Sequence, residues 1–189
     1  MGKITDIKFY GRGGQGIVTG SHILANAALI SGKHVHAFPA FGPERSGAPI
    51  SAYARISDQE FSIKTEIYEP EIVLVQDPPL IGTVDVAQGV EKGGKILINY
   101  SNDKCLQLVR KFNSVDDSVE IHWFDASKIA LDVIKRDVPN TVMLAALSKM
   151  TGIVPLESLE EAIKQQFAAR KRLIEPNLTA LRRGYDEFQ

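Results

Sequence analysis

Short apolar segments of strand character alternate with longer segments of helical character along the chain. Residues 4–10 alternate between apolar and polar positions, and 72–76 and 95–99 are short apolar runs of the kind found in buried strands. The predicted strands are residues 4–10, 34–38, 51–57, 61–65, 72–76, 95–99 and 119–124. Since 51–57 and 61–65 flank Asp58-Gln59-Glu60, they are expected to form an antiparallel hairpin.

Helical segments follow most of these strands and dominate the last third of the chain. Apolar residues recur there at three- and four-residue spacing, as at Leu159, Ile163 and Phe167. The predicted helices are residues 15–31, 127–135, 141–151, 156–171 and 176–188. Strands that alternate with helices predict a single α/β domain over residues 1–189, built on a doubly wound, mostly parallel sheet. The hairpin would add antiparallel pairing, and the C-terminal helices would form a layer.

Composition places the chain among ordinary globular proteins. It has 189 residues, of which 44% are hydrophobic and 24% charged, and its formal net charge is -1. This balance gives no electrostatic bias toward nucleic acid or an anionic membrane. The apolar runs are far shorter than the ~20 residues that span a bilayer. Residues 1–8 are mixed polar and lack the pattern of a signal peptide, so a cytoplasmic location is expected.

Cysteine and histidine content argues against a metal centre in this chain. Cys105 is the single cysteine, so no intrachain disulfide can form. A conventional iron–sulfur cluster needs about four cysteine ligands. His34 and His36 would share one face of a strand, but the neighbouring sequence supplies no further ligands, so no metal site is predicted.

A glycine-rich segment follows the first predicted strand and precedes the first predicted helix. Gly11-Arg12-Gly13-Gly14-Gln15-Gly16 fits the G-x-G-x-x-G spacing. Glycines permit positive φ and a close backbone approach, and the start of the next helix offers unpaired N–H groups to an anion. Arg12 would add a bidentate donor for phosphate or carboxylate.

Three interpretations of this loop remain open on the residues alone. A nicotinamide dinucleotide site needs an acidic residue about 20 positions further on, and residues 33–39 contain none. The second interpretation is that the loop binds the phosphate of another ligand, and the third is that its glycines serve only a tight strand-to-helix turn. Asp77 and Asn99, at strand ends, are interpreted as structural caps or turn formers, and Asn140-Thr141 as a helix cap.

The segment from 37 to 49 is the most unusual part of the chain. It holds two aromatics, three prolines and an adjacent charged pair: Phe38, Phe41, Pro39, Pro43, Pro49, Glu44 and Arg45. Proline lowers the entropy cost of ordering such a loop, so the segment suits recognition or a protein interface. The alternative is a surface loop in which Arg45 simply pairs with Glu44.

Together the two segments resemble the gamma subunit of 2-oxoacid:ferredoxin oxidoreductases. The resemblance rests on residues 11–16 and 38–49, with weaker matches at Gln76-Asp77-Pro78, Gly93-Gly94-Lys95, Pro139-Asn140-Thr141 and Asn177-Leu178. These pieces cover nearly the full length. The Arg12 form of the loop is more similar to the pyruvate and branched-chain types than to the 2-oxoglutarate type.

The resemblance implies an accessory subunit of an oxidoreductase, inactive by itself and without catalytic residues of its own. Complexes of this family cleave a 2-oxo acid with thiamine diphosphate and Mg²⁺, transfer the acyl group to coenzyme A, and pass electrons through [4Fe-4S] clusters to ferredoxin. The expected partners are alpha and beta subunits, which hold the thiamine cofactor, and a cluster-bearing delta subunit. Gly-Asp-Gly, which opens a thiamine diphosphate metal-binding segment, is absent from this sequence.

Two site roles follow as expectations. Gly11, Arg12, Gly13, Gly14, Gln15 and Gly16 would receive a phosphate of coenzyme A, and Phe38, Phe41, Glu44 and Arg45 would pack against a catalytic subunit. Both segments would leave the same edge of the sheet. The alternatives are an independent Rossmann-like nucleotide-binding protein and a purely structural connector. An exposed partner surface could also make the isolated chain a homodimer.

Overall fold

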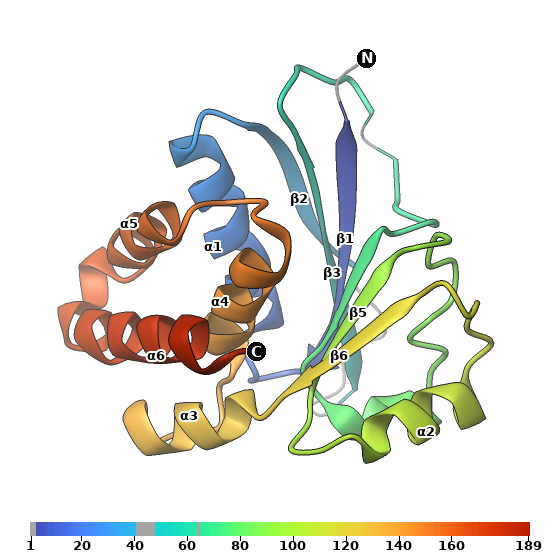
Figure 1. Ribbon diagram of the computed structural model, residues 1–189. Coiled ribbons are helices and arrows are strands. Elements are labelled where there is room, and N and C mark those ends of the chain that lie inside the picture. Colours follow the sequence, from blue (N-terminus) through green and yellow to red (C-terminus); the bar gives the residue numbers. More distant parts are fainter. Residues whose placement is uncertain (1–2, 41–47, 64) are drawn as a thin grey trace.

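A mixed β-sheet forms the centre of the molecule (Figure 1). The computed structural model describes residues 3–40, 48–63 and 65–189. Within these residues the strands are β1 (Ile4–Arg12), β2 (His34–Ala40), β3 (Pro49–Ser57), β4 (Ile72–Val75), β5 (Lys95–Asn99) and β6 (Glu120–Phe124). They lie in the order β2-β3-β1-β4-β5-β6.

Strand directions make the sheet mostly parallel, as the sequence predicts. β1, β4, β5 and β6 form parallel pairs, whereas β3 is antiparallel to both β1 and β2. β2 therefore runs in the same direction as β1. Arg12 lies opposite Pro49 and Ala40 lies opposite Ser51, so the ends of β1 and β2 reach the same edge of the sheet with β3 between them.

The predicted hairpin between 51–57 and 61–65 is wrong. β3 has its antiparallel partners in β1 and β2, and the described residues of 61–65 form no strand. Both hydrogen-bonding edges of β3 are already occupied, so no edge remains for a third partner. Residues 61–65 instead present backbone carbonyls to a side chain of β3: Arg55 Nη1 donates to the carbonyls of Ile63 at 3.2 Å and Thr65 at 3.3 Å.

Helices cover both faces of the sheet, which confirms the doubly wound arrangement. On one face lie α1 (Ile17–Ile30), α3 (Ala126–Val133), α4 (Asn140–Thr151), α5 (Leu156–Gln166) and α6 (Ile174–Glu187). On the other lie the 3₁₀ helix η1 (Pro78–Gly82) and α2 (Lys104–Phe112). Residues of β4 show why both faces need a cover, because Leu74 belongs to the first core and Val73 and Val75 to the second.

The C-terminal helices form the predicted layer rather than a free-standing unit. α4 is buried on nearly all sides from Asn140 to Ser148 and separates the sheet from α6. Gly184 allows α6 to approach α4 closely, because a Cβ there would lie 2.9 Å from Val142 Cγ1. The predicted helix over 156–171 ends earlier, at Gln166, and a 3₁₀ helix, η2 (Ala168–Leu173), continues the chain to α6.

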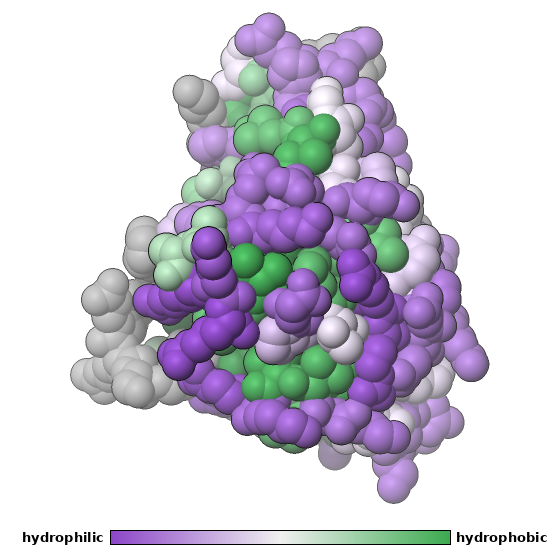
Figure 2. Space-filling view, turned by 90° about the vertical axis from the view of Figure 1, so that its left-hand side faces the viewer, coloured by the Kyte–Doolittle hydropathy of each residue, from purple (hydrophilic) through white to green (hydrophobic). Residues whose placement is uncertain are grey.

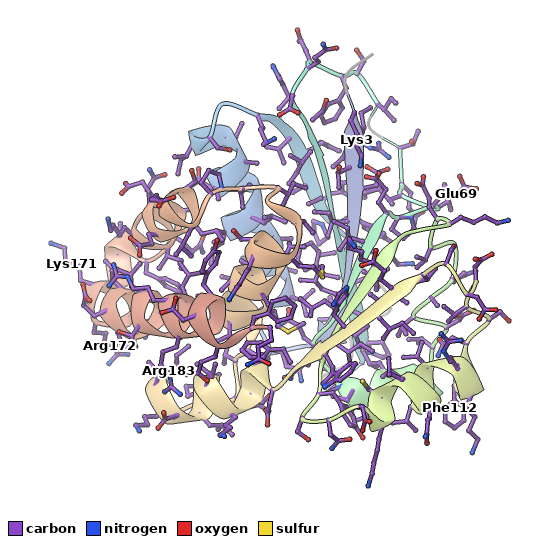
Figure 3. The ribbon with its side chains drawn as sticks, in the orientation of Figure 1. Lys3, Glu69, Phe112, Lys171, Arg172 and Arg183 are labelled. Carbon is purple, nitrogen blue, oxygen red and sulfur yellow. The ribbon has the colours of Figure 1, made fainter. Side chains whose placement is uncertain are left out.

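The outer surface of this layer is mostly hydrophilic, with scattered hydrophobic areas (Figure 2). Lys171 and Arg172 point outward from η2, as does Arg183 from α6 (Figure 3). Arg183 forms an ion pair with Asp132 that joins α6 to α3 at the surface, and a second ion pair with Glu187 of its own helix. In the described part of the chain, no helix is both long and apolar enough to cross a membrane.

Candidate functional site

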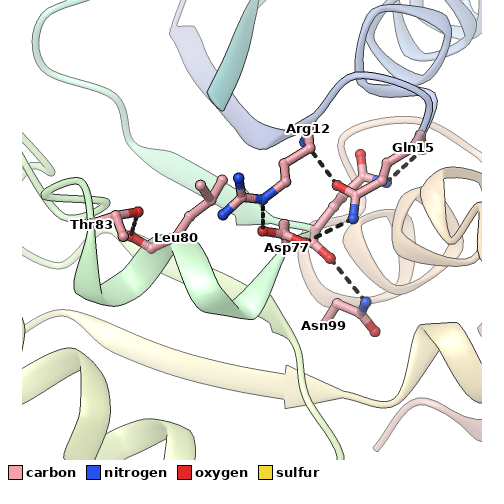
Figure 4. A network of polar contacts seen from close by, with 7 residues as sticks. Arg12, Gln15, Asp77, Leu80, Thr83 and Asn99 are labelled. Atoms are coloured by element: carbon pink, nitrogen blue, oxygen red, sulfur yellow. Dashed lines mark hydrogen bonds and ion pairs between the residues drawn. The ribbon is translucent and has the colours of Figure 1, made fainter. Parts of the chain in front are cut away.

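Polar side chains gather where β1, β4 and β5 end (Figure 4). Arg12 ends β1, Gln15 follows it in the glycine loop, Gln76 and Asp77 follow β4, and Asn99 ends β5. In the strand order, the connection after β1 leads to β2 on one side of β1, whereas β4 is the neighbour of β1 on the other side. Such a change of winding direction is where open α/β sheets place their ligands.

Two glycines of the loop are required by packing. β1 continues through Gly11 and Arg12, and a Cβ on Gly11 would lie 2.3 Å from Ile17 Cδ1. Gly16 has φ 79° at the start of α1, and a Cβ there would lie 2.7 Å from the side-chain nitrogen of Asn140. Since neither position has room for a side chain, close packing requires glycine at both positions.

The middle of the loop is open. Gly14 has φ 94°, and a Cβ there would meet no described atom within 4 Å. A Cβ on Gly13 would meet only Ile50, at the ordinary contact distance of 3.6 Å. The first turn of α1 receives no side-chain capping hydrogen bond from Gly16 and contains no acidic residue. Among the residues that the structure describes, the backbone leaves room for an anion at the start of α1.

Arg12 forms an ion pair with Asp77, which the sequence interpretation missed. Arg12 Nε lies 2.6 Å from Asp77 Oδ2, and the two side chains are 34% and 13% exposed. The interpretation of Asp77 as a cap is wrong, because its side chain makes no capping hydrogen bond to η1, but its backbone carbonyl does form a turn by accepting from Leu80 N–H at 3.0 Å. Its carboxylate binds residues of the glycine loop instead.

Gln15 forms hydrogen bonds with both residues of this ion pair. Its Nε2 donates to Asp77 Oδ1 at 2.9 Å, and its Oε1 accepts from the backbone N–H of Arg12 at 2.8 Å. The Gln15 side chain thus folds back over its own loop. The loop, the end of β4 and the Asp77 carboxylate are thereby linked into one network.

Asn99 has the structural role expected for it. Its Oδ1 accepts from the backbone N–H of Ser127 in the first turn of α3 at 3.0 Å, and its Nδ2 donates to the carbonyl of Gln76 at 2.9 Å. Asn99 therefore links the start of α3 to the segment that follows β4. The prediction that Asn140-Thr141 caps a helix is wrong, because α4 has no side-chain cap and the two side chains bond to Gly16 and Asn177 instead.

A cleft of about 280 Å³ opens beside the network. Its lining is polar and includes three carboxylates as well as the amides described above: Gln15, Gln76, Asp77, Asn99, Asp125 and Asp137. Carboxylates repel an anion, so this side of the network suits hydroxyl or amine groups better than phosphate. No group of three or more His, Cys, Asp or Glu side chains suited to a metal ion occurs in residues 3–40, 48–63 and 65–189.

Phe38 belongs to a row of aromatic side chains on the sheet surface. Its ring stacks on Tyr53 of β3 at 5.1 Å between centroids and lies 5.0 Å from the ring of His36. Burial raises the pKa of Tyr53 to about 12, with Glu66 adding to the shift, so its phenol stays protonated. Phe38 is half-buried. The other predicted interface residues, Phe41, Glu44 and Arg45, lie outside the described residues.

Comparison with known proteins matches the whole length of the chain. The family model for pyruvate ferredoxin/flavodoxin oxidoreductase matches residues 6–187. A protein of Thermococcus litoralis called pyruvate/ketoisovalerate oxidoreductases common subunit gamma is 44% identical over 184 residues, which are 96% of each chain. The pyruvate synthase subunit PorC of Thermotoga maritima is 41% identical, over 99% of this chain and 96% of the relative.

The fold agrees with this sequence similarity. The crystal structure of pyruvate oxidoreductase subunit PORC from Thermotoga maritima superposes with a TM-score of 0.85. The aligned parts are 41% identical and cover 99% of this chain and 98% of that one. A 2-oxoglutarate:ferredoxin oxidoreductase from Magnetococcus marinus shares the fold at a TM-score of 0.73, with 20% identity over 97% of this chain and 31% of its own.

Proposed function

The chain belongs to the pyruvate ferredoxin/flavodoxin oxidoreductase family, and we propose that it is the gamma subunit of a pyruvate-oxidising member. One observation supports this most strongly: relatives named as gamma subunits or PorC match it at 41% to 44% identity over nearly their full length. The chain is thus an accessory subunit of a multi-subunit 2-oxoacid:ferredoxin oxidoreductase. Its resemblance to the pyruvate and branched-chain types favours pyruvate as the substrate.

The assembled enzyme would convert a 2-oxo acid and coenzyme A to acyl-CoA and CO₂. The two electrons released would reduce two one-electron ferredoxin acceptors. We assign thiamine diphosphate, Mg²⁺ and the [4Fe-4S] clusters to the alpha, beta and delta subunits. This division suits a chain with one cysteine, since a cluster needs about four thiolate ligands.

We assign the glycine loop to a phosphate of coenzyme A. Among the described atoms, Gly13 and Gly14 leave room for a ligand and the first turn of α1 has no side-chain cap, while Arg12 ends β1 just before the loop and places its guanidinium at Asp77. Helix N-termini and guanidinium groups both favour phosphate. The loop would hold and orient coenzyme A while the bond-making steps take place in other subunits.

We assign Phe38, Phe41, Glu44 and Arg45 to the contact with a catalytic subunit. The position of Phe38 supports this, because its half-buried ring, stacked on the buried Tyr53, offers apolar area to a partner. Phe38→Ala is therefore expected to weaken assembly of the complex. Intact assembly of this variant at low subunit concentration would contradict the assignment.

Affinity purification of the chain from its native host tests the function as a whole. We expect it to bring a thiamine-binding pair of subunits and a cluster-rich small protein, with dye reduction that depends on both 2-oxo acid and coenzyme A. Comparing pyruvate with 2-oxoisovalerate as substrates would establish the preferred 2-oxo acid. Recovery of the chain alone, binding nicotinamide nucleotides, would show that the proposal is wrong.

The structure gives an independent nucleotide-binding role little support. β2 (His34–Ala40) supplies no carboxylate for a ribose hydroxyl. The isolated chain is expected to show no NADH fluorescence enhancement at ordinary nucleotide concentrations.

A further inference from the structure

Arg12 already holds an anionic group of its own chain. We propose that Asp77 competes with coenzyme A for Arg12, so that a phosphate takes the Nε donor only when the guanidinium exchanges the carboxylate for it. This inference rests on the proposed phosphate role of the glycine loop. It adds a residue that sets how strongly, and how selectively, the loop binds anions.

The contacts show a carboxylate fixed in the position of a competitor. Asp77 Oδ2 accepts from Arg12 Nε at 2.6 Å and Asp77 Oδ1 accepts from Gln15 Nε2 at 2.9 Å. Gln15 is itself anchored to the Arg12 backbone N–H. Both carboxylate oxygens are therefore engaged by the loop that is assigned to phosphate (Figure 4).

Charge makes the two anions compete. One N–H group cannot donate fully to a carboxylate and to a phosphate at once, and two negative charges repel strongly in a partly buried site. The Asp77 side chain is only 13% exposed, so water screens this repulsion poorly. A phosphate that accepts from Arg12 Nε must therefore displace the carboxylate from that position.

The side chain that moves is Arg12 rather than Asp77. Pro78 and Pro79 follow Asp77, and a residue before proline is held in the extended region, as its φ -114° and ψ 97° show. Arg12 has a long flexible stem and is 34% exposed. After the exchange Asp77 keeps the hydrogen bond from Gln15, so the carboxylate is not left without a donor.

Competition of this kind gives selectivity. Every anion has to displace Asp77, but only a ligand with further contacts elsewhere in the complex compensates for that cost. Coenzyme A has such contacts available through its nucleotide and pantetheine parts, whereas free phosphate does not. Asp77 would thus keep the loop from filling with inorganic phosphate.

Asp77→Asn in the assembled complex tests the proposal. We expect the KM for coenzyme A to fall up to about fivefold, the range expected for losing one partly exposed ion pair. The KM for pyruvate should stay unchanged, and inorganic phosphate should become a stronger inhibitor competitive with coenzyme A. Asp117→Asn is the matched control, because it breaks the exposed Arg110–Asp117 pair far from the loop.

Arg12→Ala separates this proposal from the role on which it rests. If the KM for coenzyme A rises in Arg12→Ala, and Asp77→Asn has no effect in that background, the competition is supported. If Arg12→Ala raises the KM but Asp77→Asn leaves it unchanged or raises it, the competition is overturned and the phosphate role stands. If Arg12→Ala assembles normally and leaves the KM unchanged, both fail. Thermal melting of each complex shows whether a variant is folded.

Discussion

The side-chain nitrogen of Asn140 donates a hydrogen bond to the carbonyl of Gly16 at 3.2 Å, although 124 positions separate the two residues. Gly16 begins α1 and Asn140 begins α4. Asn140 is buried, so the bond lies inside the protein between the glycine loop and the helical layer. The glycine loop is therefore bonded to α4 through Gly16 and to Asp77 through Arg12 and Gln15.

Gly16→Ala is expected to lower the free energy of unfolding by about 2 to 4 kcal/mol. Its φ of 79° strains any residue with a Cβ, and that Cβ would lie 2.7 Å from Asn140 Nδ2. Denaturant unfolding measures the loss. Gly32→Ala is the control, since Gly32 has φ 80° but no described atom within 4 Å. Equal losses of unfolding free energy in the two variants would show that the close contact with Asn140 contributes nothing to the cost.

The glycine loop also shows how far the sequence allowed the site to be predicted. Its position between a strand and a helix was predicted correctly, because the apolar pattern and the glycines are local signals. The bond between Arg12 and Asp77 spans 65 positions and depends on β4 lying beside β1. Strand order has no local signal, so the partner of Arg12 could not be found from the sequence.

Similar reasons explain the errors in the fold. Residues 61–65 have strand-like composition, but β3 already has two partners, and only the tertiary structure reveals that. α2 was missed although Cys105, Leu108, Val109 and Phe112 recur at three- and four-residue spacing, so the helical period is present in the sequence and was overlooked. Only Cys105 and Val109 of its nine residues are buried. The strand over Lys95–Asn99, buried on both faces, was predicted with its observed bounds.

Arg55 organises the segment that replaces the predicted hairpin. It forms a bidentate pair with Asp6, at 2.8 Å and 2.7 Å, and binds the carbonyls of Ile63 and Thr65. Arg55→Met is expected to cost about 3 to 5 kcal/mol of unfolding free energy, because it leaves a poorly exposed Asp6 without its cation. Denaturant unfolding measures the cost, and limited proteolysis should show earlier cleavage near residue 63.

Lys33→Met provides the comparison for Arg55. Its ion pair with Asp58 has one exposed partner, since the Asp58 side chain is 72% exposed. Loss of such a pair is expected to cost less than about 1 kcal/mol. A cost for Arg55→Met no larger than that would contradict the structural role assigned to Arg55.

Cys105 is expected to be unreactive in the folded chain. It is fully buried in α2, and burial raises the pKa of its thiol to about 11, so almost no thiolate exists near neutral pH. A thiol reagent such as Ellman's reagent should label it only after denaturant has unfolded the protein. Rapid stoichiometric labelling of the native chain would show that α2 opens readily or packs differently.

The ionised Glu91, near the amino ends of the central strands, lowers the stability of the folded protein in a pH-dependent way. Desolvation first, and then the negative charges of Glu71, Glu69 and Asp6, raise the pKa of Glu91, although the residue as a whole is exposed. A carboxyl whose pKa is higher in the folded state than in the unfolded state is destabilising when ionised. The protein therefore gains stability from this group as pH falls through its folded pKa.

Glu91→Gln should accordingly be more stable than the parent near neutral pH, by less than about 1 kcal/mol because solvent screens an exposed charge. The difference should shrink in acid, where Glu91 is protonated, and in high salt. Glu160→Gln is the opposite case, since a hydrogen bond from Arg182 lowers the pKa of Glu160. That variant should be less stable near neutral pH and approach the parent in acid. Melting temperatures across pH measure both, and the same sign of change in the two variants would contradict this account of their charges.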